Sequence, residues 1–160
     1  MTELSTLYDT NYSAWATQTA ELLRTGRFAE LDIEHLLIEL SDMSKSERDE
    51  LESRLLILIS HLLKWEYQYH TLSERWREFD GRSWQRTIIE QRKRLKRRLL
   101  KSPGLKAIVN EVIADVYSDA VDLAHKETHL PITTFPIHCP YQLAQLLDDN
   151  YYPDAGHDKP

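Results

Sequence analysis

The chain has 160 residues, a net charge of −6 and 29% charged residues, with a single cysteine and four glycines. This length suits one domain that needs no metal to hold it, and one cysteine excludes an internal disulfide. No apolar run approaches the ~20 residues that cross a bilayer, and the first residues lack the order of a signal peptide, so we expect a cytoplasmic protein without a membrane partner.

Apolar residues spaced three and four apart predict helices in the first third of the chain. Such a pattern runs from Tyr8 to Leu23 and predicts one helix, which Gly26 is well placed to end. Asp32 can cap a second helix over residues 33–43. Both helices present one apolar side, so we expect them to pack in a bundle.

A third helix is predicted to start at a capping box formed by Ser44 and Glu47. Its apolar residues alternate spacings of four and three through nearly four heptads. They are Leu51, Leu55, Leu58, Leu62, Trp65 and Tyr69. We expect this helix to lie at the centre of the bundle, with this row and Trp84 in the core. The position of Trp76, in the predicted loop, stays open.

The second half of the chain predicts two long helices and a short one. Residues 82–101 follow Gly81 and form a basic helix, and Pro103 opens a helix that runs to about residue 127. Prolines keep residues 130–139 extended, and a short helix follows over 140–147. We therefore predict an all-α fold, a compact single-domain bundle of five to six helices in antiparallel up-down hairpins. The domain spans 1–160, ordered from about 6 to 153, with a tail over 154–160.

The basic helix is the strongest functional signal. Residues 82–101 hold nine Lys or Arg and one acid, in a chain that is negative overall. Helical spacing places one set of these bases on the outward side. They are Arg86, Lys93, Arg94, Arg97, Arg98 and Lys101. Either this is a solvated face, partly neutralised by Glu111, Asp115, Asp119 and Asp122 of the next helix, or it binds an anionic partner or nucleic acid.

A second candidate site is a polar ridge beside the apolar row of the third helix. Arg54, His61 and Gln68 are seven residues apart, with Lys64 nearby, and Gln91 and Arg92 border the inner side of the basic helix. If the two ridges face each other, they form a half-buried cluster that either fixes helix register or receives an anionic ligand. We expect His61 to make at least one side-chain hydrogen bond to the protein, with a residue of the basic helix such as Gln91 as the preferred partner.

Histidines offer a weaker third possibility. His125 and His129 are four residues apart, and His138 and Cys139 follow. No HExxH or HxxEH motif, phosphate-binding glycine loop or GxSxG elbow is present. We therefore expect no metal, no cofactor and no catalytic residues.

Several stretches carry a resemblance to a known family. They are YDTNYSAW, LLRTGRFAELDIEHL, RLLILISHLLKWEYQ, SWQRTIIEQR, SPGL and FPIHCPYQLAQLLDD followed by YYP. Through them the chain resembles the bacterial "domain of unknown function 29" family from Tyr8 to Pro153. The family pattern has paired acids near Ile38 and Glu39, where this chain has only Glu39. The resemblance implies an all-helical domain of unassigned function and brings no catalytic residues.

Three function classes follow, in order of preference. The first is a binding or regulatory module without catalysis that contacts a partner protein. The second is a nucleic-acid-binding domain that uses the basic helix over residues 82–101. The third is a metal-dependent hydrolase that uses the histidines.

Overall fold

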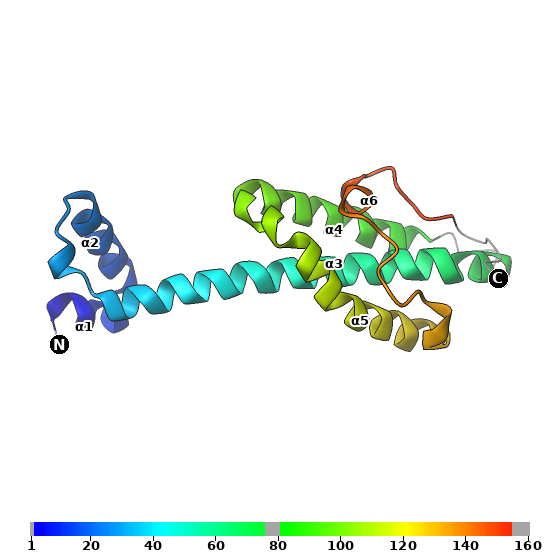
Figure 1. The fold of residues 1–160 in the computed structure, drawn as a ribbon, viewed down its shortest axis with the longest axis horizontal. Coiled ribbons are helices and arrows are strands. Elements are labelled where there is room, and N and C mark those ends of the chain that lie inside the picture. The colour runs from blue at the N-terminus through cyan, green and yellow to red at the C-terminus, as the bar shows by residue number, and fades with distance from the viewer. Residues whose placement is uncertain (1, 76–80, 155–160) are drawn as a thin grey trace. The chain divides into compact units, whose positions relative to one another are not determined.

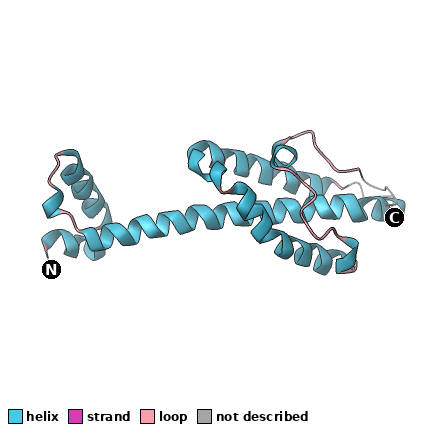
Figure 2. Ribbon diagram, viewed as in Figure 1, coloured by secondary structure: helices cyan, strands magenta, loops and turns pink. Residues whose placement is uncertain are grey.

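The computed structural model describes residues 2–75 and 81–154, without the side chains of residues 70–75. All regular secondary structure in these ranges is helical (Figure 2), which confirms the predicted all-α bundle. The helices form two compact units, residues 1–46 and 47–160, called here the N-terminal and C-terminal units. Trp76 and residues 155–160 of the predicted tail lie outside the described residues.

The N-terminal unit contains α1 (Glu3–Thr10), α2 (Tyr12–Arg24), a 3₁₀ turn at Phe28–Glu30 and the start of α3 (Ile33–Arg75). The single helix predicted from Tyr8 to Leu23 is wrong, because the chain breaks at Asn11. The Asn11 amide donates to the Leu7 carbonyl and ends α1, while its side chain accepts from the Ala14 amide and starts α2. A short polar side chain that caps a helix start stabilises this break.

The helix α3 runs without interruption where two helices were predicted. Ser44 and Glu47 match a capping box in sequence, but Ser44 lies inside the helix and caps nothing. No glycine or proline occurs between Ile33 and Arg75, so no residue forces the backbone out of helical geometry. A serine costs little within a helix, and the helix therefore continues.

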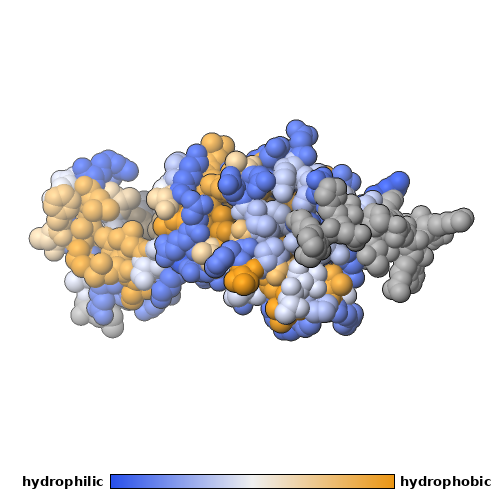
Figure 3. Space-filling model, turned by 45° about the vertical axis from the view of Figure 1, so that its right-hand side comes forward, coloured by the Kyte–Doolittle hydropathy of each residue, from blue (hydrophilic) through white to orange (hydrophobic). Residues whose placement is uncertain are grey.

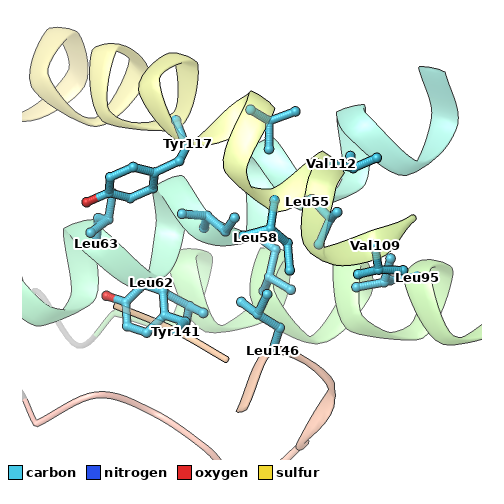
Figure 4. Packing of buried hydrophobic residues seen from close by; sticks show 14 of the residues in the cluster. Leu55, Leu58, Leu62, Leu63, Leu95, Val109, Val112, Tyr117, Tyr141 and Leu146 are labelled. Carbon is cyan, nitrogen blue, oxygen red and sulfur yellow. The ribbon is translucent and has the colours of Figure 1, made fainter. Parts of the chain in front are cut away.

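The C-terminal unit packs α4 (Arg82–Lys101) and α5 (Val109–Thr128) along the second part of α3 (Figure 1). Leu55, Leu58 and Leu62 are fully buried, as predicted, and meet apolar residues of α4 and α5 (Figure 4). Trp65 and Trp84 were expected in the core but are only partly buried. The Trp65 ring stacks on Tyr69, with 4.5 Å between the ring centres.

The connections differ in detail from those predicted. Pro103 opens a 3₁₀ segment, Pro103–Ala107, and α5 begins only at Val109. The region expected to be extended contains a 3₁₀ turn at Ile132–Thr134, and the short helix predicted over 140–147 is α6 (Leu143–Leu147).

Candidate functional site

The outward side of α4 carries the predicted basic face. Arg86, Lys93, Arg94, Arg97 and Lys101 are exposed, and Arg98 is half-buried. The inner side holds Ile88, Leu95 and Leu99, which are buried. The amphipathic pattern of α4 thus fixes which charges reach water, because the apolar stripe must face α3 and α5.

Acids compensate only part of this charge. Arg94 pairs with Glu90 one turn earlier, Arg98 with Glu47 of α3, and Lys96 with Asp149 near the C-terminus. The acids expected to compensate it lie on α5 and two of them have other partners. Asp115 pairs with Arg48 and Asp122 with Lys126, so the expectation is wrong for these two residues.

Four exposed bases of the predicted basic face have no acidic partner among residues 2–75 and 81–154. They are Arg86, Lys93, Arg97 and Lys101. A groove of about 440 Å³ runs along this side. Its lining comprises Lys93, Arg94, Arg97, Arg98 and Lys101 with the two acids Glu50 and Glu90. The groove is therefore predominantly basic, and an anionic group inside it would meet several cations at once.

Two exposed aliphatic residues border the basic side of α4. Leu100 is 81% exposed and Ile89 is 55% exposed. On a helix of 3.6 residues per turn, Ile89 lies about one turn from Lys93, and Leu100 lies about one turn from Arg97. A partner bound along this side would therefore contact apolar surface as well as charge.

The six residues predicted to form one polar cluster separate into three places. At the first, Arg54 of α3 donates to the Gln91 side chain at 3.1 Å and also pairs with Glu50. This contact joins α3 to α4, and in it the two side chains occupy one another, as the register alternative requires.

At the second place, His61, Lys64 and Gln68 lie toward the end of α5 and not toward Gln91. Lys64 is almost buried, pairs with Glu127 and lies 5.2 Å from the centre of the Trp84 ring. Gln68 donates to the Thr128 carbonyl.

His61 makes hydrogen bonds to the protein, as predicted, but the preferred partner Gln91 is wrong. His61 Nδ1 contacts the Ile57 carbonyl, which leaves Nε2 to accept from Lys64 at 3.5 Å. Burial and the neighbouring Lys64 lower the pKa of His61.

At the third place, Arg92 is fully buried against the C-terminal segment. Its guanidinium donates to the carbonyls of Leu146, Gln145 and Tyr151 at 3.0, 3.2 and 2.7 Å, and lies over the Tyr152 ring. These carbonyls include the last ones of α6, which have no partner within that helix. Burial lowers the pKa of Arg92. Arg92 therefore ties the chain end to α4 and is not available to a ligand.

Sequence reasoning missed a polar cluster in the N-terminal unit. The hydroxyls of Tyr8 and Tyr12 donate to the two oxygens of Glu39 at 2.5 and 2.6 Å. The hydrogen bonds from Tyr12 and Tyr8 lower the pKa of Glu39, and the bond to Glu39 raises the pKa of Tyr8 to about 12. One carboxylate thus holds α1 and α2 to α3.

A second carboxylate continues the same cluster. Asp32 accepts from the Trp15 indole at 3.1 Å and from His35 Nδ1 at 2.6 Å, and the His35 ring stacks on Tyr8. Burial works to raise the pKa of Asp32, but the hydrogen bonds from His35 and Trp15 outweigh it and lower that pKa. The sequence signal was a pair of tyrosines four residues apart, together with one acid three residues before His35 and another four residues after it. Both carboxylates are occupied by the protein's own donors.

The histidines near the end of α5 do not converge. His125 Nδ1 contacts the Leu130 carbonyl at 2.6 Å, and His129 adopts a left-handed conformation at the helix end. Within the described ranges, no three His, Cys, Asp or Glu side chains are grouped so as to hold a metal ion. In the same part of the chain, no helix combines the length and the apolar character needed to span a membrane.

Comparison with known proteins identifies a family and nothing more specific. No curated protein and no solved structure matches the chain. A family model described as "Domain of unknown function DUF29" matches residues 7–152. This range includes both the cluster of the N-terminal unit and the basic face of α4. The chain therefore belongs to the DUF29 family.

Proposed function

We propose that this protein is a helical binding module without catalysis, and that the basic side of α4 receives an acidic segment of a partner protein. The observation that carries the proposal is the set of exposed bases Lys93, Arg97 and Lys101 beside a groove. They have no acidic partner within the described residues.

The spacing of these bases fits an acidic helix. Lys93, Arg97 and Lys101 follow one another at four residues, which is about 6 Å of rise along a helix for each step. A second helix with Glu or Asp at the same spacing would place one carboxylate beside each base. Such pairs at the edge of an interface set partner choice and orientation.

The neighbouring residues favour a protein over a nucleic acid. Ile89 and Leu100 offer apolar contact, which a protein helix can use and a phosphate backbone cannot. Glu50 and Glu90 line the same groove and would repel phosphates. A bacterial cytoplasmic location belongs to the same proposal, and the free thiol of Cys139 is compatible with it.

The test uses a fluorescent helical peptide with Glu at every fourth position and Leu between. Substituting Lys93→Gln together with Lys101→Gln should weaken binding several-fold, because each exposed pair contributes about 0.2–1 kcal/mol. The matched control is Lys45→Gln with Lys106→Gln, which removes the same net charge from exposed residues elsewhere. A scrambled peptide of equal composition should bind less well. Equal binding by both double variants would contradict the proposal.

Nucleic acid is the second candidate, supported by the same exposed bases. Single- and double-stranded DNA and RNA oligonucleotides are measured beside the peptide. If the oligonucleotide binds more tightly than the peptide and its affinity falls steeply with salt, the face contacts phosphates and the protein-partner proposal is wrong. We expect the peptide to bind more tightly and to lose less affinity in salt, because part of its contact is apolar.

A further inference from the structure

The first part of α3 presents its apolar side outward in the N-terminal unit. These residues, called here the open stripe, are Ile33, Leu36, Leu37, Leu40 and Met43. Ile33 is 52% exposed, Leu37 62%, Leu40 55% and Met43 61%. In Figure 3, apolar surface gathers over the part of the molecule that holds this unit.

The polar side of this helix segment, next to the open stripe, is the one that α1 and α2 contact. His35 stacks on Tyr8, and Glu39 binds Tyr8 and Tyr12. The contacts that hold the unit together are therefore made by the polar side of α3. Among the described residues of the unit, Leu36 is the partly buried member of the open stripe and the other four members are exposed, which is the reverse of an ordinary amphipathic helix.

The buried apolar core of the N-terminal unit is too small to account for the folding of this unit. Among its described residues, Leu4 and Trp15 are the buried hydrophobic side chains. A segment of this size does not normally fold on so little apolar burial without another surface to cover it. The open stripe is an uncovered apolar surface available for that purpose.

We propose that the open stripe binds the same stripe of a second copy of this chain, with the two α3 segments antiparallel. The residues Ile33, Leu36, Leu40 and Met43 follow the spacing of a coiled-coil seam. Antiparallel alignment then places Ile33 against Met43 and Leu36 against Leu40 in four successive apolar layers. Two stripes together would bury on the order of 1,000 Å², the lower limit for a specific interface.

Charge along α3 decides against the parallel alternative. One heptad beyond Leu40, the seam position is occupied by Glu47. Glu47 pairs with Arg98 of its own chain, so parallel pairing would bring the Glu47–Arg98 pairs of both copies together, whereas the antiparallel register ends the seam before that residue. The positions beside the open stripe include Ser44 and Ser46, which are uncharged, so two copies can approach without like-charge repulsion there.

The first experiment measures mass by sedimentation at several concentrations. The parent chain should be a dimer, and Leu40→Glu should raise its dissociation constant on the order of 100-fold, because a charge enters the seam from both copies. Lys45→Glu is the control, since Lys45 is exposed and lies away from the seam. Leu40 is 55% exposed and lies outside the core of the C-terminal unit, so that unit should stay folded in the variant, and urea denaturation followed by circular dichroism checks this.

The second experiment reads the direction of pairing. In a Cys139→Ser background, chains with Leu36→Cys and with Leu40→Cys are mixed and oxidised. Antiparallel pairing predicts a disulfide between the two different variants, whereas parallel pairing predicts disulfides between identical ones. Lys45→Cys should form neither.

A monomeric parent chain, or crosslinks only between identical variants, would overturn the proposal. The Lys93 and Lys101 double variant should remain dimeric, so this result is independent of the proposed function.

Discussion

The two units are built in opposite ways. In the C-terminal unit, α3, α4 and α5 bury leucine, isoleucine and valine between them and leave charge outside. In the N-terminal unit, α3 turns Glu39 and His35 toward its neighbours and leaves Leu37 and Leu40 outside. The difference shows that an amphipathic sequence does not by itself determine which side of a helix the rest of its own unit covers.

The two units have different sources of stability. The C-terminal unit is stabilised by apolar burial, so its surface is free to carry the charge of α4. The N-terminal unit has directional hydrogen bonds to two carboxylates, and most of the open stripe is exposed.

The largest expected effect tests apolar burial in both units. Leu58→Ala removes a fully buried side chain and should lower the free energy of unfolding by about 2–5 kcal/mol. Leu37→Ala truncates a leucine that is 62% exposed and should cost less than about 1 kcal/mol when the protein is kept dilute. Urea denaturation followed by circular dichroism measures both. Equal losses would mean that the two leucines are buried to the same degree in solution.

The next effect concerns the buried cation of the C-terminal unit. Arg92→Met keeps most of the side-chain volume but leaves the carbonyls of Leu146, Gln145 and Tyr151 without their donor. We expect a loss of about 3 kcal/mol and faster proteolysis around α6. Arg86→Met, on the exposed side of the same helix, is the control and should change neither. Intact protection of α6 in Arg92→Met would show that the guanidinium does not hold the chain end.

A smaller effect distinguishes the N-terminal unit at alkaline pH. Tyr8 has its pKa raised to about 12 by Glu39, against about 10 in an unfolded chain. Because the folded pKa is the higher one, the bond contributes fully below pH 10 and is lost as the pH rises toward 12. Because the pKa values of Tyr12, Tyr117 and Tyr141 are raised as well, the Tyr8 ring is followed by NMR, and Glu39→Gln should move its titration toward 10. Glu34→Gln, an exposed neighbour on α3, should leave it in place.

The smallest effect occurs at acid pH in the C-terminal unit. Burial and Lys64 lower the pKa of His61, so the folded protein resists the proton that the unfolded chain accepts. Stability should therefore decline as the pH falls below about 6.5 and through the folded pKa. NMR titration of the His61 ring gives that pKa directly. A titration at or above 6.5 would contradict the buried contact with Lys64.

Helix content and the main core could be predicted from the sequence, because both follow from local spacing. The row of Leu55, Leu58 and Leu62 is buried as its heptads indicate. Helix ends were less predictable, since Asn11 breaks a helix by capping while Ser44, of similar capping ability, does not. Whether such a residue ends a helix depends on competition between its side-chain cap and continued backbone hydrogen bonding. The outcome of that competition depends on what the capped or the continued helix packs against.

The basic face of α4 was predictable in position, but its partners were not. Spacing placed Lys93, Arg97 and Lys101 outward, as observed. Ion pairing depends on which long side chains meet across elements, so Asp115 turned out to pair with Arg48. The cluster of Tyr8, Tyr12 and Glu39 joins residues about thirty apart in the chain, and periodicity within one helix carries no information about such contacts.

The unbroken course of α3 has a consequence for amide hydrogen exchange. One helix takes part in a well-packed unit over its later turns and in a sparsely packed one over its first turns. The backbone hydrogen bonds of α3 are continuous. The free energy needed to open them differs along the helix, because it depends on the local packing. Amides near Leu58 should exchange only through global unfolding, while those near Leu37 should exchange much faster. A second copy bound to the open stripe would slow the exchange of these early amides and leave the later ones unchanged.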